Sequence, residues 1–85
     1  MDMIIEENWA VSIERVQQFF TQQPDILQTP EGFEYADCRI TLTGTQSTIL
    51  GHWNMPRTWV RMEGSDEDVR AIHRRFYLRF LSAGG

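Results

Sequence analysis

Apolar residues recur every three or four positions near the end of the chain, and this spacing predicts a helix over residues 65–81. The apolar face of this helix holds four residues: Val69, Ile72, Phe76 and Phe80. Ser65 followed by Asp68 is typical of a capping box, and the acids at residues 66–68 favour the positive end of a helix dipole. The C-terminal helix is therefore expected to bury one side.

A second helical pattern runs from Trp9 to Phe20. Its apolar residues fall on one side of a helical wheel: Trp9, Val11, Ile13, Val16, Phe19 and Phe20. The helix should end before Pro24, because the residue before a proline is pushed out of the helical region. Asn8 or Ser12 is the expected cap. The short apolar run at residues 3–5 is a candidate edge strand.

Between the helices the apolar period changes to two, which predicts β-strands. The first strand covers residues 33–43 and turns its smaller apolar residues to the core: Ala36, Cys38, Ile40 and Leu42. The Gly44-Thr45 pair is a plausible turn after it. Residues 24–32 hold two prolines and a glycine and are typical of a loop, which Ile26 and Leu27 should attach to the core.

Two further strands are predicted, at residues 48–53 and 58–63. Gly51 suggests a bulge in the first of them. The turn between them falls at residues 54–56, which end in a proline. Val60 and Met62 lie on the core face of the last strand. Short connections of this kind imply antiparallel neighbours.

These elements predict one α+β domain over residues 1–85. The element order is helix, three-stranded antiparallel meander, helix (α-β-β-β-α), with a possible short N-terminal edge strand. Two amphipathic helices and a half-buried sheet are best satisfied when both helices cover the same sheet face. The expected architecture is therefore a two-layer sandwich with one open sheet face.

Composition excludes several functions. The net charge of −4 argues against general binding to a phosphate backbone, although residues 65–85 carry +1 and residues 1–64 carry −5. All eight basic residues are arginines, which removes lysine-based catalysis. One cysteine, no apolar run of membrane-spanning length and no secretory leader pattern indicate a cytoplasmic protein without contact to a membrane.

The open sheet face is the strongest candidate for function. The expected alternation places five aromatic and arginine residues on or near it: Tyr35, Arg39, Trp53, Trp59 and Arg61. Exposed aromatic residues and arginines are favoured in protein–protein interfaces. Three tryptophans are also hard to bury in so small a domain. We expect a domain that acts by protein–protein contact or oligomerisation, with a homodimer through this face as one form.

Two resemblances give alternatives. The order helix, three strands, helix resembles that of a double-stranded-RNA-binding domain, which implies binding to RNA. Such domains begin their second helix with a basic, lysine-rich segment, whereas this helix begins Asp66-Glu67-Asp68. Binding to nucleic acid is therefore the less favoured function.

The tail Ser82-Ala83-Gly84-Gly85 resembles the small ubiquitin-like sulfur carriers in its last two glycines. This resemblance implies adenylation at the carboxylate of the diglycine. The fold of those carriers places a strand before the tail and the main helix in mid-chain, whereas this chain places a helix before the tail. A helix that stops with a glycine just past its last turn explains Gly84 without any chemistry, so the carrier is a minor alternative.

Catalytic and metal-binding groups are sparse. Cys38 on the core face is best explained as a small buried hydrophobic residue, and a Cys38–His52 nucleophile pair would contradict the strand alternation. His73 borders the apolar stripe and fits a packed side chain. No spacing typical of a metal site or a cofactor motif is present, so an enzyme is the least favoured class. Leu78, opposite the core stripe beside Arg74, Arg75 and Arg79, could help a partner to dock.

Overall fold

The computed structural model describes residues 2–49 and 53–83 as a five-stranded sheet with two helices. Along the chain the elements are β1 (Asp2–Trp9), α1 (Ile13–Thr21), β2 (Leu27–Thr29), β3 (Gly32–Tyr35), β4 (Cys38–Ile49), β5 (Trp53–Ser65) and α2 (Asp66–Ala83). The α+β class predicted from the sequence is confirmed. The N-terminal strand is longer than expected, since β1 runs through Trp9 and pairs with β5 along its whole length.

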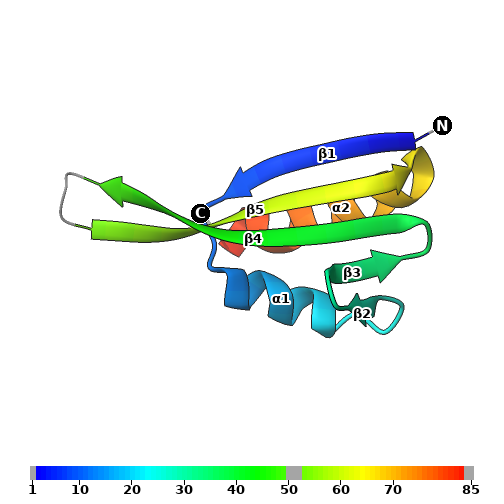
Figure 1. The fold of residues 1–85 in the computed structure, drawn as a ribbon, viewed down its shortest axis with the longest axis horizontal. Coiled ribbons are helices and arrows are strands. Elements are labelled where there is room, and N and C mark those ends of the chain that lie inside the picture. The colour runs from blue at the N-terminus through cyan, green and yellow to red at the C-terminus, as the bar shows by residue number, and fades with distance from the viewer. Residues whose placement is uncertain (1, 50–52, 84–85) are drawn as a thin grey trace.

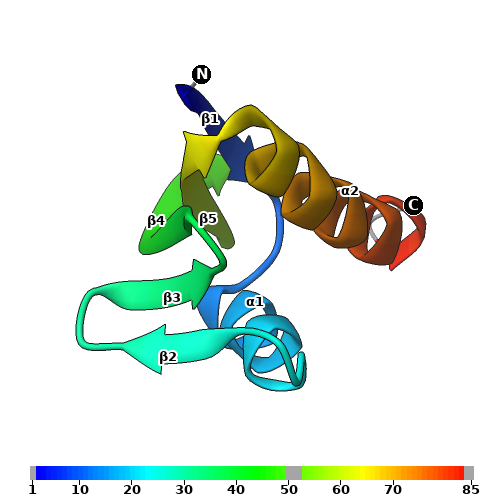
Figure 2. The same cartoon turned by 90° about the vertical axis from the view of Figure 1, so that its right-hand side faces the viewer.

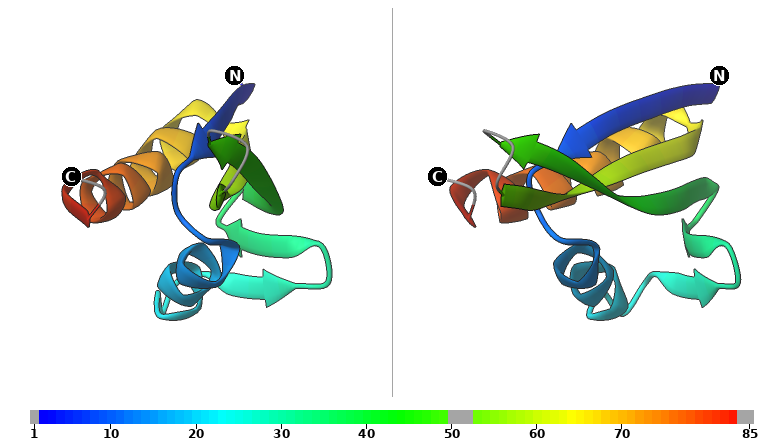
Figure 3. Two further views of the ribbon diagram at one scale, coloured as in Figure 1. Left: turned by 90° about the vertical axis from the view of Figure 1, so that its left-hand side faces the viewer. Right: turned by 60° about the vertical axis from the view of Figure 1, so that its left-hand side comes forward.

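All paired strands are antiparallel, and the sheet order is β1-β5-β4-β3-β2 (Figure 1). Both helices lie on one side of the sheet, with α2 beside β1 and β5 and α1 nearer β4 (Figures 1 and 2). The view from the opposite end shows the same arrangement and leaves the other face of the sheet uncovered (Figure 3). The molecule is thus two-layered, with one open sheet face.

Five phenylalanines form the centre of the core between the sheet and the helices. Phe76 of α2 contacts the ring of Trp9 at 5.1 Å, that of Phe20 at 5.8 Å and that of Phe80 at 5.0 Å between centroids. Phe33 brings β3 into the same cluster through Phe20. The apolar stripe predicted for α2 is fully confirmed: Val69, Ile72, Phe76 and Phe80 are each at most 1% exposed.

The predicted three-stranded meander is wrong, because β4 and β5 are two long strands that pair from Arg39↔Glu63 to Ile49↔Trp53. β4 continues through the proposed Gly44-Thr45 turn. Gly44 lies within the strand beside Ile13 of α1, where an added Cβ would make an ordinary 3.5 Å contact, and it forms no turn. β5 likewise continues through Pro56, which lies beyond the end of β1, where a missing N–H is tolerated. The predicted bulge at Gly51 lies outside the described residues.

The predicted strand over residues 33–43 is in fact a hairpin. β3 and β4 pair as Tyr35↔Cys38, and residues 36–37 form the turn between them. Ala36 is therefore exposed instead of buried, and its φ of 49° lies in the left-handed region. The hairpin also places Tyr35 on the same face as Cys38, which is the face that the helices cover. The placement of Tyr35 on the open face was wrong for this reason.

The helix boundaries follow local hydrogen bonding. α2 begins at Asp66, and the Asp68 N–H donates to Ser65 Oγ at 3.4 Å, as the capping pattern predicted. α1 begins one turn later than predicted, and Ser12 occupies its N-cap position without a side-chain cap bond. Buried Thr58 donates its hydroxyl to the Val11 carbonyl at 2.6 Å and so attaches this junction to β5. No helix in the described part of the chain is long and apolar enough to cross a membrane.

The segment predicted as a loop at residues 24–32 contains the short strand β2, which pairs with β3. Ile26 is 8% exposed and attaches the segment to the core, as expected. Leu27 is 68% exposed and does not. β2 is the outer strand of the sheet at this edge, so one side of Leu27 has no neighbouring strand to cover it.

Candidate docking surface

The open face consists of the side chains on β1, β5 and β4 that point away from the helices. Burial alternates along these strands, with Val60 and Met62 of β5 nearly inaccessible on the helix side. Nine residues make up the open face: Ile4, Glu6, Asn8, Arg39, Thr41, Thr43, Trp59, Arg61 and Glu63. The pairing register sets them in rows across the sheet.

Arg61 is the centre of the charged row. Its Nε lies 3.2 Å from Glu6 Oε1 of β1, and its Nη2 donates to Glu63 Oε2 at 3.0 Å. The Nε contact is a charge contact without hydrogen-bond geometry. The three side chains are about 40% exposed, so each pair contributes little to stability. Their main effect is to hold the Arg61 guanidinium between Glu6 and Glu63 on the open face.

A shallow hollow lies beside this row. It has a volume of about 300 Å³ and is lined by Glu31, Arg39, Thr41, Arg61 and Glu63. Arg39 lies opposite Glu63 on one side and Glu34 on the other in the strand register. Among the described residues no carboxylate comes within 4.0 Å of the Arg39 guanidinium, so its donors are available to a partner.

Trp59 is the large aromatic side chain of the open face and is 39% exposed. In register it lies between Asn8 of β1 and Thr43 of β4. Asn8 Oδ1 accepts a 2.7 Å hydrogen bond from Arg57 Nε, which fixes the Asn8 side chain beside the Trp59 ring. Ile4, 52% exposed, adds a second apolar side chain on β1. The face is therefore mixed: apolar side chains stand among charged groups of both signs.

The structure brings together three of the five residues predicted for partner binding: Arg39, Trp59 and Arg61 share the open face. Tyr35 does not join them, because it packs against the core and beneath the Arg75 guanidinium at 5.1 Å. The side chain of Trp53 lies outside the part of the structure that is described. That these residues bind a partner stays a prediction.

Arg75 explains what Tyr35 does instead. Its two Nη atoms donate to the Asp25 carboxylate at 2.9 and 2.8 Å, so that α2 is tied to the segment before β2. Hydrogen bonding to Arg75 holds the pKa of Asp25 below its usual value. Tyr35 lies under this pair on the helix side of β3.

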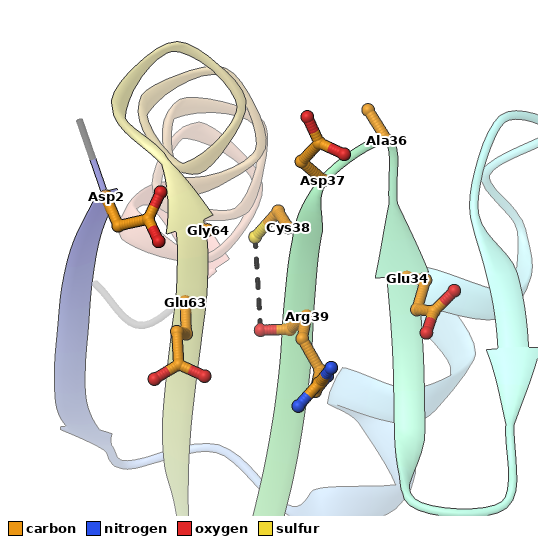
Figure 4. A pocket seen from close by; sticks show the side chains of 8 residues that line it. All are labelled: Asp2, Glu34, Ala36, Asp37, Cys38, Arg39, Glu63 and Gly64. Atoms are coloured by element: carbon orange, nitrogen blue, oxygen red, sulfur yellow. Dashed lines mark hydrogen bonds between the residues drawn. The ribbon is translucent and has the colours of Figure 1, made fainter.

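A second hollow, of about 340 Å³, opens at the end of the sheet where the β3–β4 turn meets the end of β5. Figure 4 shows Glu63, Arg39 and Glu34 in one row across three strands, with Asp2 and Asp37 nearer the rim. In the described residues no group of three or more metal-ligating side chains converges, here or elsewhere. Four acids thus line this hollow around one arginine.

The remaining candidate groups are also accounted for. Cys38 is 1% exposed on the helix face, and burial raises the pKa of its thiol to about 11, so it is no nucleophile at neutral pH. His73 is packed as expected, with Nε2 2.8 Å from Glu7 Oε1, and Trp9 Nε1 donates to the same oxygen at 3.0 Å. His52 lies outside the described residues.

Sequence reasoning missed the contribution of β1 to the open face. Ile4 and Glu6 lie there because β1 pairs with β5 in the register Ile4↔Glu63 and Glu6↔Arg61. The alternation in residues 2–9 is obscured, since Ile4 faces out and Glu7 faces the helices. The sequence offered only a weak indication of this strand: the apolar residues Met3, Ile5 and Trp9 all fall at odd-numbered positions and so on one side of it.

Comparison with protein-family models found that the model described as "Archaeal MoaD-like protein" matches residues 10–85. The match spans α1 through α2 and leaves out β1, which therefore contributes to the open face from beyond the matched segment. Comparisons with curated proteins and with solved structures gave no significant match.

Proposed function

The chain belongs to the family of archaeal MoaD-like proteins, and from this we propose that it acts in sulfur transfer by docking onto a partner protein through the open face. The observation that carries the proposal is Trp59, an aromatic side chain 39% exposed on a sheet face that neither helix covers. Aromatic residues of this kind contribute much of the binding energy in protein interfaces.

The charges on the open face indicate what a partner would offer. Arg39 has no carboxylate partner among residues 2–49 and 53–83, while Glu6 and Glu63 already hold Arg61. A partner that places a carboxylate at Arg39 and an apolar group on Trp59 would satisfy both without breaking the existing pairs. A second form of the proposal is a homodimer, in which the open faces of two copies of the chain meet.

The experiment compares two exposed-residue variants, Trp59→Ala and Gln18→Ala, as tagged baits in a lysate of the source organism. Gln18 is exposed on α1, which lies on the opposite side of the sheet from the open face, so it is the matched control. Mass spectrometry should find proteins retained by the unaltered chain and by Gln18→Ala but lost with Trp59→Ala. Equal retention by both variants would reject the open face as the docking surface.

Light scattering after size-exclusion chromatography separates the homodimer from the heterologous partner. If the open face joins two copies, the unaltered chain is a dimer and Trp59→Ala is a monomer at the same concentration. A dimer that persists in Trp59→Ala contradicts this form of the proposal. A monomer throughout leaves docking to a different protein as the form to be tested by the retention experiment.

A second candidate function is a diglycine sulfur carrier, which the family match favours because the matched segment runs to residue 85 and includes Gly84 and Gly85. In this role the Gly85 carboxylate would be adenylated and then converted to a thiocarboxylate by partner enzymes. α2 continues to Ala83, immediately before the two glycines. A carrier would thus have to present its carboxylate close to the end of a helix.

Intact-mass spectrometry tests the carrier role on a chain that ends at Gly85. The chain is incubated with ATP, an activating enzyme for diglycine carriers and a sulfur donor. A carrier gains the mass expected for a thiocarboxylate, and deletion of Gly85 abolishes the gain. An unchanged mass, under conditions that convert an authentic carrier, rejects this candidate and leaves the docking proposal untouched.

A further inference from the structure

The side of α2 that faces away from the core carries a second stripe of residues at helical spacing. We call it the outer stripe; it consists of Glu67, Arg70, Arg74, Tyr77, Leu78 and Leu81, all of them exposed. Residues three and four positions apart are neighbours on a helix, so Arg70, Arg74 and Leu78 form one continuous row. Tyr77 and Leu81 form a second row beside it.

The C-terminal half of the outer stripe is apolar. Tyr77 is 41% exposed, Leu78 60% and Leu81 51%. They are three of the seven large hydrophobic residues that are exposed within the described part of the chain, and they lie within two turns of one helix. A helix that serves only to cover a sheet is expected to be polar on this side. Grouped apolar exposure of this kind marks an interaction surface.

The N-terminal half of the outer stripe is basic. Among the described residues, no carboxylate lies within 4.0 Å of Arg70 or Arg74, whereas the adjacent Arg75, outside the outer stripe, holds Asp25 in two hydrogen bonds. Glu67, one turn before Arg70, reduces the positive charge of the stripe in part. Glu7, on the neighbouring strand, is occupied by His73 and Trp9. Within the described residues, the two guanidinium groups therefore have no carboxylate partner.

We propose that the outer stripe docks an acidic amphipathic helix of a partner protein. The row from Arg70 to Leu81 is roughly 16 Å long, which matches about three turns of a second helix packed ridge into groove. The apolar side chains of such a helix cover Tyr77, Leu78 and Leu81. Its carboxylates meet Arg70 and Arg74, which supply the specificity.

Charge complementarity favours this occupant over two others. A second copy of α2 presents the same arginines and brings no carboxylate to them beyond Glu67. An anionic lipid surface would be repelled by the remainder of a chain whose net charge is −4. The outer stripe is separate from the open face, so the inference stands whether or not the open face binds a partner.

The test is a titration of the ¹⁵N-labelled chain with two synthetic helical peptides, followed by amide chemical shifts. One peptide carries leucines at helical spacing flanked by glutamates, and the matched peptide replaces each glutamate by lysine. We expect saturable shifts at Arg70, Arg74 and Leu78 with the glutamate peptide, and affinity at least about tenfold weaker for the lysine peptide. The double variant R70E/R74E should reverse the preference.

Three results would overturn the proposal: no binding of either peptide, equal binding of both, or shifts confined to the open face. The variant Leu78→Ser/Leu81→Ser provides a further check. It should lose peptide binding while its unfolding midpoint stays unchanged, since both side chains are exposed. If this variant instead converts a dimer to a monomer, or abolishes binding to anionic vesicles, the occupant is a second copy or a lipid surface and the proposal fails.

Discussion

At the scale of single residues, Cys38 is a thiol that the fold keeps neutral. Burial raises its pKa to about 11, and the nearby Asp68 carboxylate acts in the same direction. We expect the native protein to resist a thiol reagent at pH 8 and the denatured protein to react at once. Measurable reaction of the native chain at the rate of a free thiol would contradict the buried position.

The raised pKa of Cys38 also makes stability depend on pH. The thiol in the unfolded chain ionises near pH 9, whereas in the folded chain it stays neutral to about pH 11. The neutral Cys38 thiol therefore contributes fully to the free energy of unfolding below pH 9. This contribution is lost as pH rises from 9 towards 11, by an amount on the order of 2 kcal/mol. Urea denaturation at pH 7 and pH 10 measures about half of this loss, because pH 10 lies midway between the two pKa values, and Cys38→Ala should show a smaller loss.

Gly64 is required for close packing between β5 and the β3–β4 turn. A Cβ at this position would lie 2.2 Å from the carbonyl oxygen of Asp37, which is backbone and cannot rotate away. We expect Gly64→Ala to destabilise the protein by about 2 kcal/mol or more. Gly44→Ala is the matched control, because its Cβ would make an ordinary 3.5 Å contact with Ile13. Equal denaturation midpoints for the two variants would refute the steric argument.

At the scale of elements, the two helices differ in how they begin. Ser65 accepts a hydrogen bond from the Asp68 N–H at the start of α2, whereas Ser12 at the start of α1 makes no side-chain cap bond. Ser65→Ala should therefore lower the free energy of unfolding by about 1 kcal/mol, and Ser12→Ala by clearly less. Chemical denaturation followed by circular dichroism compares them. A larger loss for Ser12→Ala would be inconsistent with these caps.

Sequence periodicity predicted the helices because their signals are local. The stripe of α2 and its capping serine depend on contacts within a few residues, and both were found where expected. The strand breaks were mispredicted because glycine and proline have more than one use. Gly44 lies in the interior of β4 beside Ile13, and Pro56 lies beyond the end of β1, where a missing N–H is tolerated.

Part of the open face could be predicted from the sequence, because the alternation along a strand is also a local signal. Arg39, Trp59 and Arg61 lie on β4 and β5, where apolar and polar residues alternate regularly. Their position on one sheet face could therefore be predicted from the alternation. Tyr35 was misplaced because the hairpin turn before Cys38 contains Ala36 at a positive φ, where glycine or asparagine is the usual signal. The outer stripe of α2 was indicated only through Leu78, since Tyr77 and Leu81 become recognisable as exposed once the sheet fixes which side of α2 is buried.

At the scale of the whole molecule, Phe76 joins the layers. Its ring contacts Trp9 of β1, Phe20 of α1 and Phe80 of α2. We expect Phe76→Ala to cost about 3–5 kcal/mol, enough to unfold a domain of this size. Leu78→Ala, two residues further along the same helix and 60% exposed, should be nearly neutral. Thermal denaturation of the pair measures the contrast, and a stable Phe76→Ala would show that the layers hold without it.

The length of β4 and β5 has a further consequence, for the time course of hydrogen exchange. β1 ends at the pair Trp9↔Thr58, and β3 reaches only Ile40, so the pairs from Thr45↔Arg57 outward belong to a ribbon of two strands (Figure 1). Opening that ribbon breaks its own backbone bonds and the hydrogen bonds from Arg57 to Asn8 at its base. Opening at Ile40 or Met62 instead disrupts the sheet and the core beneath it. Deuterium should therefore enter each strand progressively, from the Thr45 and Arg57 amides inward, so that one hairpin records both local opening and global unfolding.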